Sequence, residues 1–172
     1  AFVLVYISFM GYAGDRVTAW LHPEQDPSDT GYQILQSLYA IGSGGLFGLG
    51  FGNSRQKYMY VSEPQNDFIF TIICEELGFV GAFLVVFMFV MLIWRGIRIG
   101  QHAPDKFCAL VVWGLTFKIA LQVAMNIAVV TNTLPSTGVS LPFFSYGGSS
   151  LLVLFMEMGV VLSISRFSYQ SK

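Results

Sequence analysis

Apolar residues are arranged along this chain in long runs that polar segments separate. A helix needs about 20 largely apolar residues to cross the hydrocarbon core of a bilayer. Three runs reach or approach that length and predict membrane helices at 67–94, 107–131 and 149–165. Residues 1–13 are also apolar, but as a helix they would extend only about 20 Å, so we interpret them as one end of a truncated membrane helix.

Basic residues predict how these helices cross the membrane. Lys and Arg lie close to the predicted helix ends in the loop 95–106 and in the tail 166–172. Because cytoplasmic loops of membrane proteins are enriched in both residue types, we expect these two segments to be cytoplasmic. The segments 14–66 and 132–148 are then external, which three alternating crossings allow.

Composition supports a membrane protein and excludes other classes. Of the 172 residues, 54% are hydrophobic and 11% are charged, whereas about 25% of residues are charged in soluble proteins. The net charge of −1 opposes nucleic-acid binding and the aromatic content of 16% opposes disorder. Two cysteines are too few for a disulfide scaffold. The sequence predicts an all-α fold, a polytopic integral membrane helix bundle, as one membrane domain over residues 1–172.

The large external segment 14–66 has a substructure of its own. Apolar residues recur at helical spacing in 32–41 and predict a short amphipathic helix along the membrane interface. Six glycines follow within 42–52, but they form no GxGxxG motif in register and follow no predicted strand, which excludes a dinucleotide site. We expect these glycines to allow close backbone approach or a re-entrant path.

Each predicted span contains an ionisable residue away from its ends, namely Glu75 and Glu76, then Lys118, then Glu157. A charge in the bilayer costs at least about 2.5–3.5 kcal/mol, so such groups face a protein interior or water. Lys118 and Glu157 both lie near mid-depth, where they could form a structural ion pair between helices. At least one of the two adjacent glutamates must point into the bundle, because consecutive residues differ by about 100° around a helix.

Two further polar residues in the second span, Gln122 and Asn126, are spaced i,i+4 and form a polar stripe. Such a stripe favours hydrogen bonds between helices over a ligand site.

Asp67 stands where the polar loop EPQND meets the apolar run FIFTII. One interpretation is structural, with Asn66 or Asp67 capping the first free amides of the helix and complementing its dipole. The other is a carboxylate at the outer membrane surface, partly desolvated and basic enough to act as a general base. The two are compatible, because a capping geometry would also fix the side chain.

The loop 134–150 contains the pentapeptide LPSTG, which matches the LPxTG signal that sortases process. A membrane span precedes it, and Pro142 and Glu157 interrupt the apolar stretch after it, so we reject that interpretation. The serines of this loop have no histidine nearby in sequence and fit no GxSxG elbow, which opposes nucleophilic catalysis. We expect the loop to shape a lipid-facing cavity and not to supply acid–base chemistry.

Three longer segments have a more specific match. They are STGVSLPFFSYGGSSLL at 136–152, GYQILQSLYAIGSGGLFGLGFGNSRQKYMY and SEPQNDFIFTIICEELGFVG. Together they resemble the SEDS family of bacterial shape, elongation, division and sporulation proteins, which includes FtsW, RodA and SpoVE. The resemblance covers residues 16–166, with the motifs in the same order and at the same spacing. The motifs SRQKYMY, EPQ and EELGF are more similar to those of the division and sporulation branch than to those of the elongation branch.

This resemblance implies a multi-pass protein of the bacterial cytoplasmic membrane with about ten helices, of which this chain is the C-terminal part. It implies a peptidoglycan glycosyltransferase that polymerises lipid II outside that membrane. The essential acid of the family's large external loop corresponds to Asp67. As general base, Asp67 would take the proton of a sugar 4-hydroxyl that attacks an anomeric carbon, with inversion and loss of lipid pyrophosphate.

The same resemblance suggests substrate-binding candidates and partners. Arg55 and Lys57 could stabilise the departing pyrophosphate, although they could equally be two exposed basic residues, and a divalent cation (Mg²⁺ or Mn²⁺) could serve instead. Ser145, Gly147 and Gly148 are further candidates for substrate binding. Expected partners are lipid II, membrane lipid, a class B penicillin-binding protein with transpeptidase activity and division or sporulation proteins, but no nucleic acid. Two alternative functions are a lipid II flippase and a non-catalytic scaffold that recruits a transpeptidase.

Overall fold

The computed structural model describes residues 14, 16–17, 19–24, 29–54 and 67–168, and all regular elements in these residues are helical. Four longer helices follow one another along the chain: α2 (Asp29–Gly44), α4 (Ile69–Gln101), α5 (Lys106–Val130) and α6 (Gly148–Ser168). The predicted all-α fold is confirmed. Residues 1–13, for which we predicted a truncated helix, lie outside the described residues.

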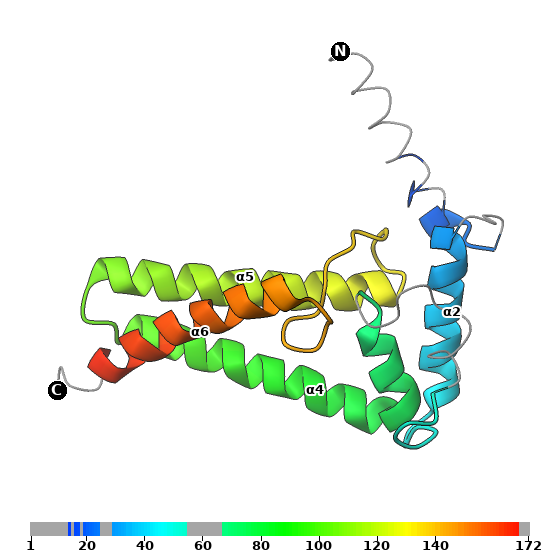
Figure 1. Ribbon diagram of the computed structural model, residues 1–172, viewed down its shortest axis with the longest axis horizontal. Helices are drawn as coiled ribbons and strands as arrows, with labels where there is room; N and C mark the ends of the chain where they lie inside the picture. Colours follow the sequence, from blue (N-terminus) through cyan, green and yellow to red (C-terminus); the bar gives the residue numbers. More distant parts are fainter. Residues whose placement is uncertain (1–13, 15, 18, 25–28, 55–66, 169–172) are drawn as a thin grey trace, which may run out of the picture.

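Three of these helices, α4, α5 and α6, are long and apolar enough to cross a membrane. They lie side by side along the long axis of the molecule (Figure 1). Their contact faces bury Phe89, Ile119 and Leu154 in one core cluster. Their outer faces expose large apolar side chains such as Phe117, which is 68% accessible. An apolar outer face suits a lipid environment and would be unfavourable in water.

The helix bounds of α5 and α6 agree closely with the sequence prediction, whereas those of α4 do not. We predicted a span at 67–94 followed by a loop at 95–106, but α4 continues to Gln101. The reason is its close packing on α5. A Cβ atom on Gly96 would lie 2.3 Å from Thr116 Oγ1, and one on Gly100 would lie 2.2 Å from Trp113 Nε1. The two glycines therefore let the extended end of α4 rest directly on α5.

A kink at Gly78 divides α4 into a short arm at 69–77 and a long arm at 79–101. Gly78 has φ 66° and ψ −165°, a conformation outside the helical region that is essentially restricted to glycine. The short arm runs beside α2 across one end of the bundle, and the long arm runs along α5 and α6 (Figure 1). We predicted one continuous helix here, and that prediction was wrong.

The glycine-rich segment at 44–52 supplies the backbone hydrogen bonds that the kink removes. In a continuous helix the amides of Phe79 and Val80 would donate to the carbonyls of Glu75 and Glu76. Here the two amides donate instead to the carbonyls of Gly45 and Leu46, at 2.9 and 3.2 Å. The two freed carbonyls accept from the amides of Leu49 and Gly50, at 2.9 and 3.1 Å. The expected close backbone approach of this segment is confirmed.

Helix α2 covers the predicted amphipathic stretch at 32–41 and packs on α4 and α5. Its inner face buries Ile34, Ser37 and Ala40 completely or nearly so, while Tyr39 on the other face is 62% exposed. The Ser37 hydroxyl donates to the carbonyl of Val130 at 3.0 Å. This contact fixes α2 to the end of α5.

Candidate functional site

Asp67 lies half-buried in the turn that precedes α4. The N-cap position of α4 is taken by the next residue, Phe68, which makes no side-chain capping hydrogen bond among the described residues. The amide and the hydroxyl of Thr71 instead bind the carbonyl of Phe68, at 3.0 and 2.6 Å. The start of the helix is thus secured by Thr71, and Asp67 is not its N-cap residue.

Asn126 of α5 connects this turn to the loop between α5 and α6. Its side chain is 1% exposed. Its Nδ2 atom donates to the carbonyl of Asp67 at 2.8 Å and to the carbonyl of Val139 at 2.7 Å. One helical turn earlier, Gln122 Nε2 donates to the carbonyl of Ser140 at 3.0 Å. The polar stripe therefore binds a loop and a turn, whereas we expected it to bind a neighbouring helix.

Gly138 brings the loop after α5 close to the carboxylate of Asp67. Its φ is +67°, a left-handed conformation that L side chains rarely adopt. A Cβ atom on Gly138 would lie 3.5 Å from Asp67 Oδ2. Two residues near the N-terminus also bind this loop. Arg16 Nη1 donates to the carbonyl of Ser136 at 2.6 Å, and Trp20 Nε1 donates to the carbonyl of Asn132 at 2.9 Å.

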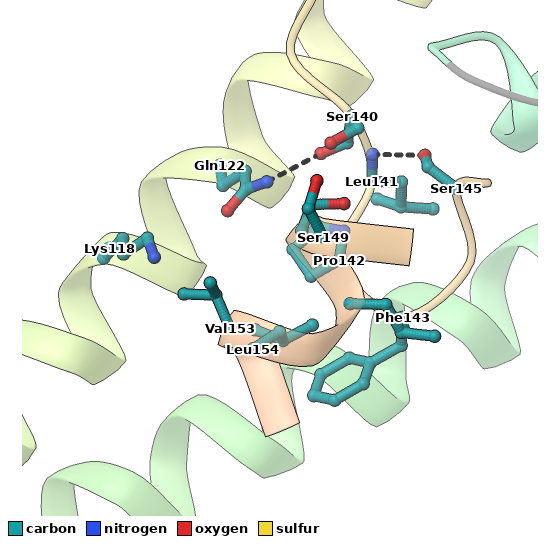
Figure 2. A pocket seen from close by; sticks show the side chains of 12 residues that line it. Lys118, Gln122, Ser140, Leu141, Pro142, Phe143, Ser145, Ser149, Val153 and Leu154 are labelled. Atoms are coloured by element: carbon teal, nitrogen blue, oxygen red, sulfur yellow. Dashed lines mark hydrogen bonds between the residues drawn. The ribbon is translucent and has the colours of Figure 1, made fainter. Parts of the chain in front are cut away.

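A cavity of about 310 Å³ lies beside this loop, between α5 and the beginning of α6. Figure 2 shows the polar and apolar side chains around it. Ser145 is buried in its wall, and its hydroxyl oxygen accepts a hydrogen bond from the amide of Leu141 at 2.7 Å. The other lining residues are Lys118, Gln122, Ser140, Leu141, Pro142, Phe143, Ser149, Ser150, Leu151, Val153 and Leu154. The expectation that this loop shapes a cavity agrees with this geometry.

The remaining predicted substrate-binding residues lie at different places. Gly148 is the first residue of α6. Gly147 precedes it, and its carbonyl accepts from the hydroxyl of Ser150 and the amide of Leu151, both at 2.9 Å. Both glycines therefore lie at the start of α6, directly before the cavity-lining residues Ser149 and Ser150. Arg55 and Lys57 lie outside the described residues.

Glu75 and Glu76 are both buried, with 1% and 8% of their surface exposed. The Ser54 hydroxyl donates to Glu75 Oε2 at 2.5 Å. Glu76 Oε1 is buried and has no hydrogen-bond partner among the described residues. Because of the kink, both acids lie on the short arm beside α2 and not partway along the long arm, as a continuous helix would require.

Lys118 and Glu157 form an ion pair that joins α5 to α6. The Lys118 side chain is 50% exposed and that of Glu157 is 16% exposed. Glu157 Oε2 is buried without a hydrogen-bond partner in the described part of the chain. The pair lies at the edge of the cavity through Lys118.

The described residues contain no group of three or more His, Cys, Asp or Glu side chains that could hold a metal ion. A requirement for Mg²⁺ or Mn²⁺ therefore stays an expectation that rests on the family resemblance.

Comparison with known proteins identifies the family. A family model for FtsW, RodA and SpoVE proteins, described as cell cycle protein, matches residues 1–170. The chain belongs to the FtsW/RodA/SpoVE family. Membership in this family and the three apolar helices make it part of a multi-pass membrane protein.

Several curated members of the FtsW/RodA/SpoVE family are similar over most of the chain. The stage V sporulation protein E of Bacillus subtilis is 54% identical over 157 residues, which are 91% of this chain and 43% of that protein. A probable peptidoglycan glycosyltransferase FtsW of Trichlorobacter lovleyi is 44% identical over 164 residues, which are 95% of this chain and 43% of that protein. The chain thus spans less than half the length of these relatives.

A solved structure shares the arrangement of the helices. This structure is of a peptidoglycan synthase complex and concerns the structural coordination of polymerization and crosslinking by that complex. One of its chains is 31% identical, with a TM-score of 0.74 over 96% of this chain and 45% of that chain. The fold of this part of the FtsW/RodA/SpoVE family is therefore confirmed.

The sequence analysis did not predict the roles of Gly138 and Asn126. Asn126 was visible as an amide within an apolar helix, but its partners come from two distant segments. The proximity of Gly138 to Asp67 could not be recognised in the sequence, because it depends on how the loop folds.

Proposed function

We propose that the full protein is a peptidoglycan glycosyltransferase that polymerises lipid II at the outer face of the cytoplasmic membrane. The observation that carries this proposal is the placement of Asp67, whose carboxylate lies beside Gly138 at the end of the helix bundle. Relatives named probable peptidoglycan glycosyltransferase FtsW support the same reaction. These names, together with the proposed outer position of the carboxylate, support a peptidoglycan precursor as the substrate class.

The proposed reaction is a single displacement at an anomeric carbon. The 4-hydroxyl oxygen of one saccharide forms a bond to the anomeric carbon of a second, while the bond from that carbon to the lipid pyrophosphate breaks. Asp67 accepts the hydroxyl proton, and the pyrophosphate leaves with the electron pair of the broken bond. A general base of this kind contributes about 10²–10⁴-fold to the rate. Because the carbon is attacked opposite the leaving group, its configuration inverts.

The cavity beside the loop supplies a binding surface for part of the lipid-linked saccharide. Its wall combines apolar side chains with several serines, which suits a molecule that has both sugar and lipid portions. The Ser145 hydroxyl accepts from the Leu141 amide and so keeps its own hydrogen for donation. Gly147 and Gly148 lie next to it, at the start of α6. Arg55 and Lys57 remain proposed contacts to the pyrophosphate, and a Mg²⁺ or Mn²⁺ requirement remains an expectation.

The proposed partner is a class B penicillin-binding protein, a transpeptidase that crosslinks the glycan. The similar chain in the peptidoglycan synthase complex supports such a pairing. The similarity to stage V sporulation protein E and to FtsW proteins supports a role in sporulation or division. Membrane lipid would surround the exposed apolar faces of α4, α5 and α6.

Polymerisation in detergent tests this function against the alternatives. The full-length protein, purified with its partner transpeptidase, is incubated with dispersed lipid II, which needs no transport across a membrane. We expect glycan strands to form even when the transpeptidase is blocked with a β-lactam. A flippase or a scaffold would form no strands under these conditions, and that result would contradict the proposal.

A further inference from the structure

Asn126 reaches Asp67 from a different helix and holds its backbone. The buried side chain of Asn126 has two N–H groups and uses both on carbonyls, those of Asp67 and Val139. Its oxygen, Oδ1, is buried without a partner among the described residues. Since both neighbouring groups are acceptors, only the nitrogen of the amide can face them. The side chain therefore has one preferred orientation.

We infer that Asn126 is a positioning residue that holds the Asp67 carboxylate in its reactive geometry, an inference that rests on the proposed function. The hydrogen bond at 2.8 Å fixes the peptide unit between Asp67 and Phe68. On the other side of that unit, Thr71 binds the carbonyl of Phe68 at 2.6 Å. The backbone on the C-terminal side of Asp67 is therefore held at two points, which limits where the carboxylate can lie.

The second bond of Asn126 places the loop against the same carboxylate. Val139, whose carbonyl binds Asn126 at 2.7 Å, directly follows Gly138. Gly138 has no side chain and is exposed, and a Cβ atom there would lie 3.5 Å from Asp67 Oδ2. One amide group thus sets the distance between the carboxylate and an open stretch of backbone. A sugar hydroxyl can approach the carboxylate along this stretch without meeting a Cβ atom.

Loss of this contact should lower the rate of the chemical step more than substrate binding. A misplacement of about 1 Å can cost about 10²-fold in rate. The variant Asn126→Leu has a similar size and removes both hydrogen bonds. Ser37→Ala is the matched control, because Ser37 is also buried and donates to a carbonyl of α5, that of Val130 at 3.0 Å. Neither of the carbonyls that Ser37 binds, those of Ile34 and Val130, belongs to the turn that contains Asp67.

The test measures lipid II polymerisation by the full-length protein with its partner transpeptidase, per amount of folded enzyme. We expect Asn126→Leu to lower kcat by about 10- to 100-fold with KM within about threefold of wild type, and Ser37→Ala to keep kcat within about twofold. A purely structural role would reduce the amount of folded protein and leave kcat per folded enzyme unchanged, which would overturn the inference.

Two further measurements separate this inference from the proposed function. If Asn126→Leu does not fold, Asn126→Ala removes the same two hydrogen bonds with a smaller side chain, and an unchanged kcat in that variant would overturn the inference. The pH profile of kcat should keep its acidic decline in the Asn126 variants, because Asp67 is still the base. If wild type polymerises lipid II and Asp67→Asn does not, while the Asn126 variants keep wild-type kcat, only the positioning role fails. If wild type forms no glycan, the proposed function itself fails.

Discussion

Gly78 lies so close to Gly48 that a Cβ atom on Gly78 would be 2.3 Å from the Gly48 backbone nitrogen. The reverse contact is equally tight, since a Cβ atom on Gly48 would lie 2.1 Å from the carbonyl oxygen of Glu76. Both glycines also have positive φ, 66° and 78°. The kink in α4 and the glycine-rich segment therefore depend on each other, and together they set the direction of the short arm, which follows the turn that contains Asp67.

Replacing Gly78 with alanine should disrupt this contact. The strained backbone alone costs about 1–3 kcal/mol, and the overlap with Gly48 adds to that cost. We expect a lower melting temperature of the full-length protein in detergent, together with a lower rate of polymerisation. Gly42→Ala is the control, because Gly42 lies in α2 and a Cβ atom there would meet no atom of the described residues within 4 Å. Equal melting temperatures for the two variants would show that the kink does not need glycine.

The ion pair between Lys118 and Glu157 should be visible as coupling between the two residues. Each single variant, Lys118→Met or Glu157→Gln, leaves the partner charge unpaired inside the bundle, whereas the double variant removes both charges. Because residues in direct contact couple by about 0.5–3 kcal/mol, the double variant should be more stable than the sum of the single changes implies. Thermal unfolding in detergent measures this cycle. Additive changes would mean that the pair contributes nothing to holding α5 and α6 together.

The orientation of the chain can be tested by cysteine labelling in a cysteine-free background. Gln101 is exposed at the end of α4, and Thr137 is exposed in the loop after α5. We expect a membrane-impermeant thiol reagent to label Thr137→Cys in intact cells and to label Gln101→Cys only after the membrane is opened. Labelling of Gln101→Cys in intact cells would reverse the topology and place Asp67 on the side without the proposed substrate.

Much of the fold could be predicted because the bilayer imposes a simple length rule. Apolar runs of about 20 residues located α5 and α6 to within a few residues, and helical spacing located α2. The kink at Gly78 could not be found in this way, because a glycine in an apolar run is compatible with a continuous helix. Its conformation depends on backbone bonds to Gly45 and Leu46, which are distant in sequence.

The candidate site was predicted only in part, because its contacts also join segments that are distant in sequence. Asp67 stood out as an acid where a polar loop meets an apolar run, and its proposed role came from the family resemblance. The spacing of Gln122 and Asn126 predicted hydrogen bonds to a neighbouring helix, but periodicity does not reveal which backbone carbonyl a buried amide will bind. The contact between Gly138 and Asp67 likewise arises only when the loop folds back along α5.

The most direct test of the account is the polymerisation rate of Asp67→Asn in the full-length protein with its partner transpeptidase. Asparagine keeps the size of the side chain and much of its hydrogen-bonding capacity but cannot accept a proton near neutral pH. We predict that the variant folds, inserts into the membrane and binds its partner, yet forms glycan about 10²–10⁴-fold more slowly than wild type. A rate within about threefold of wild type would contradict the assignment of Asp67 as general base.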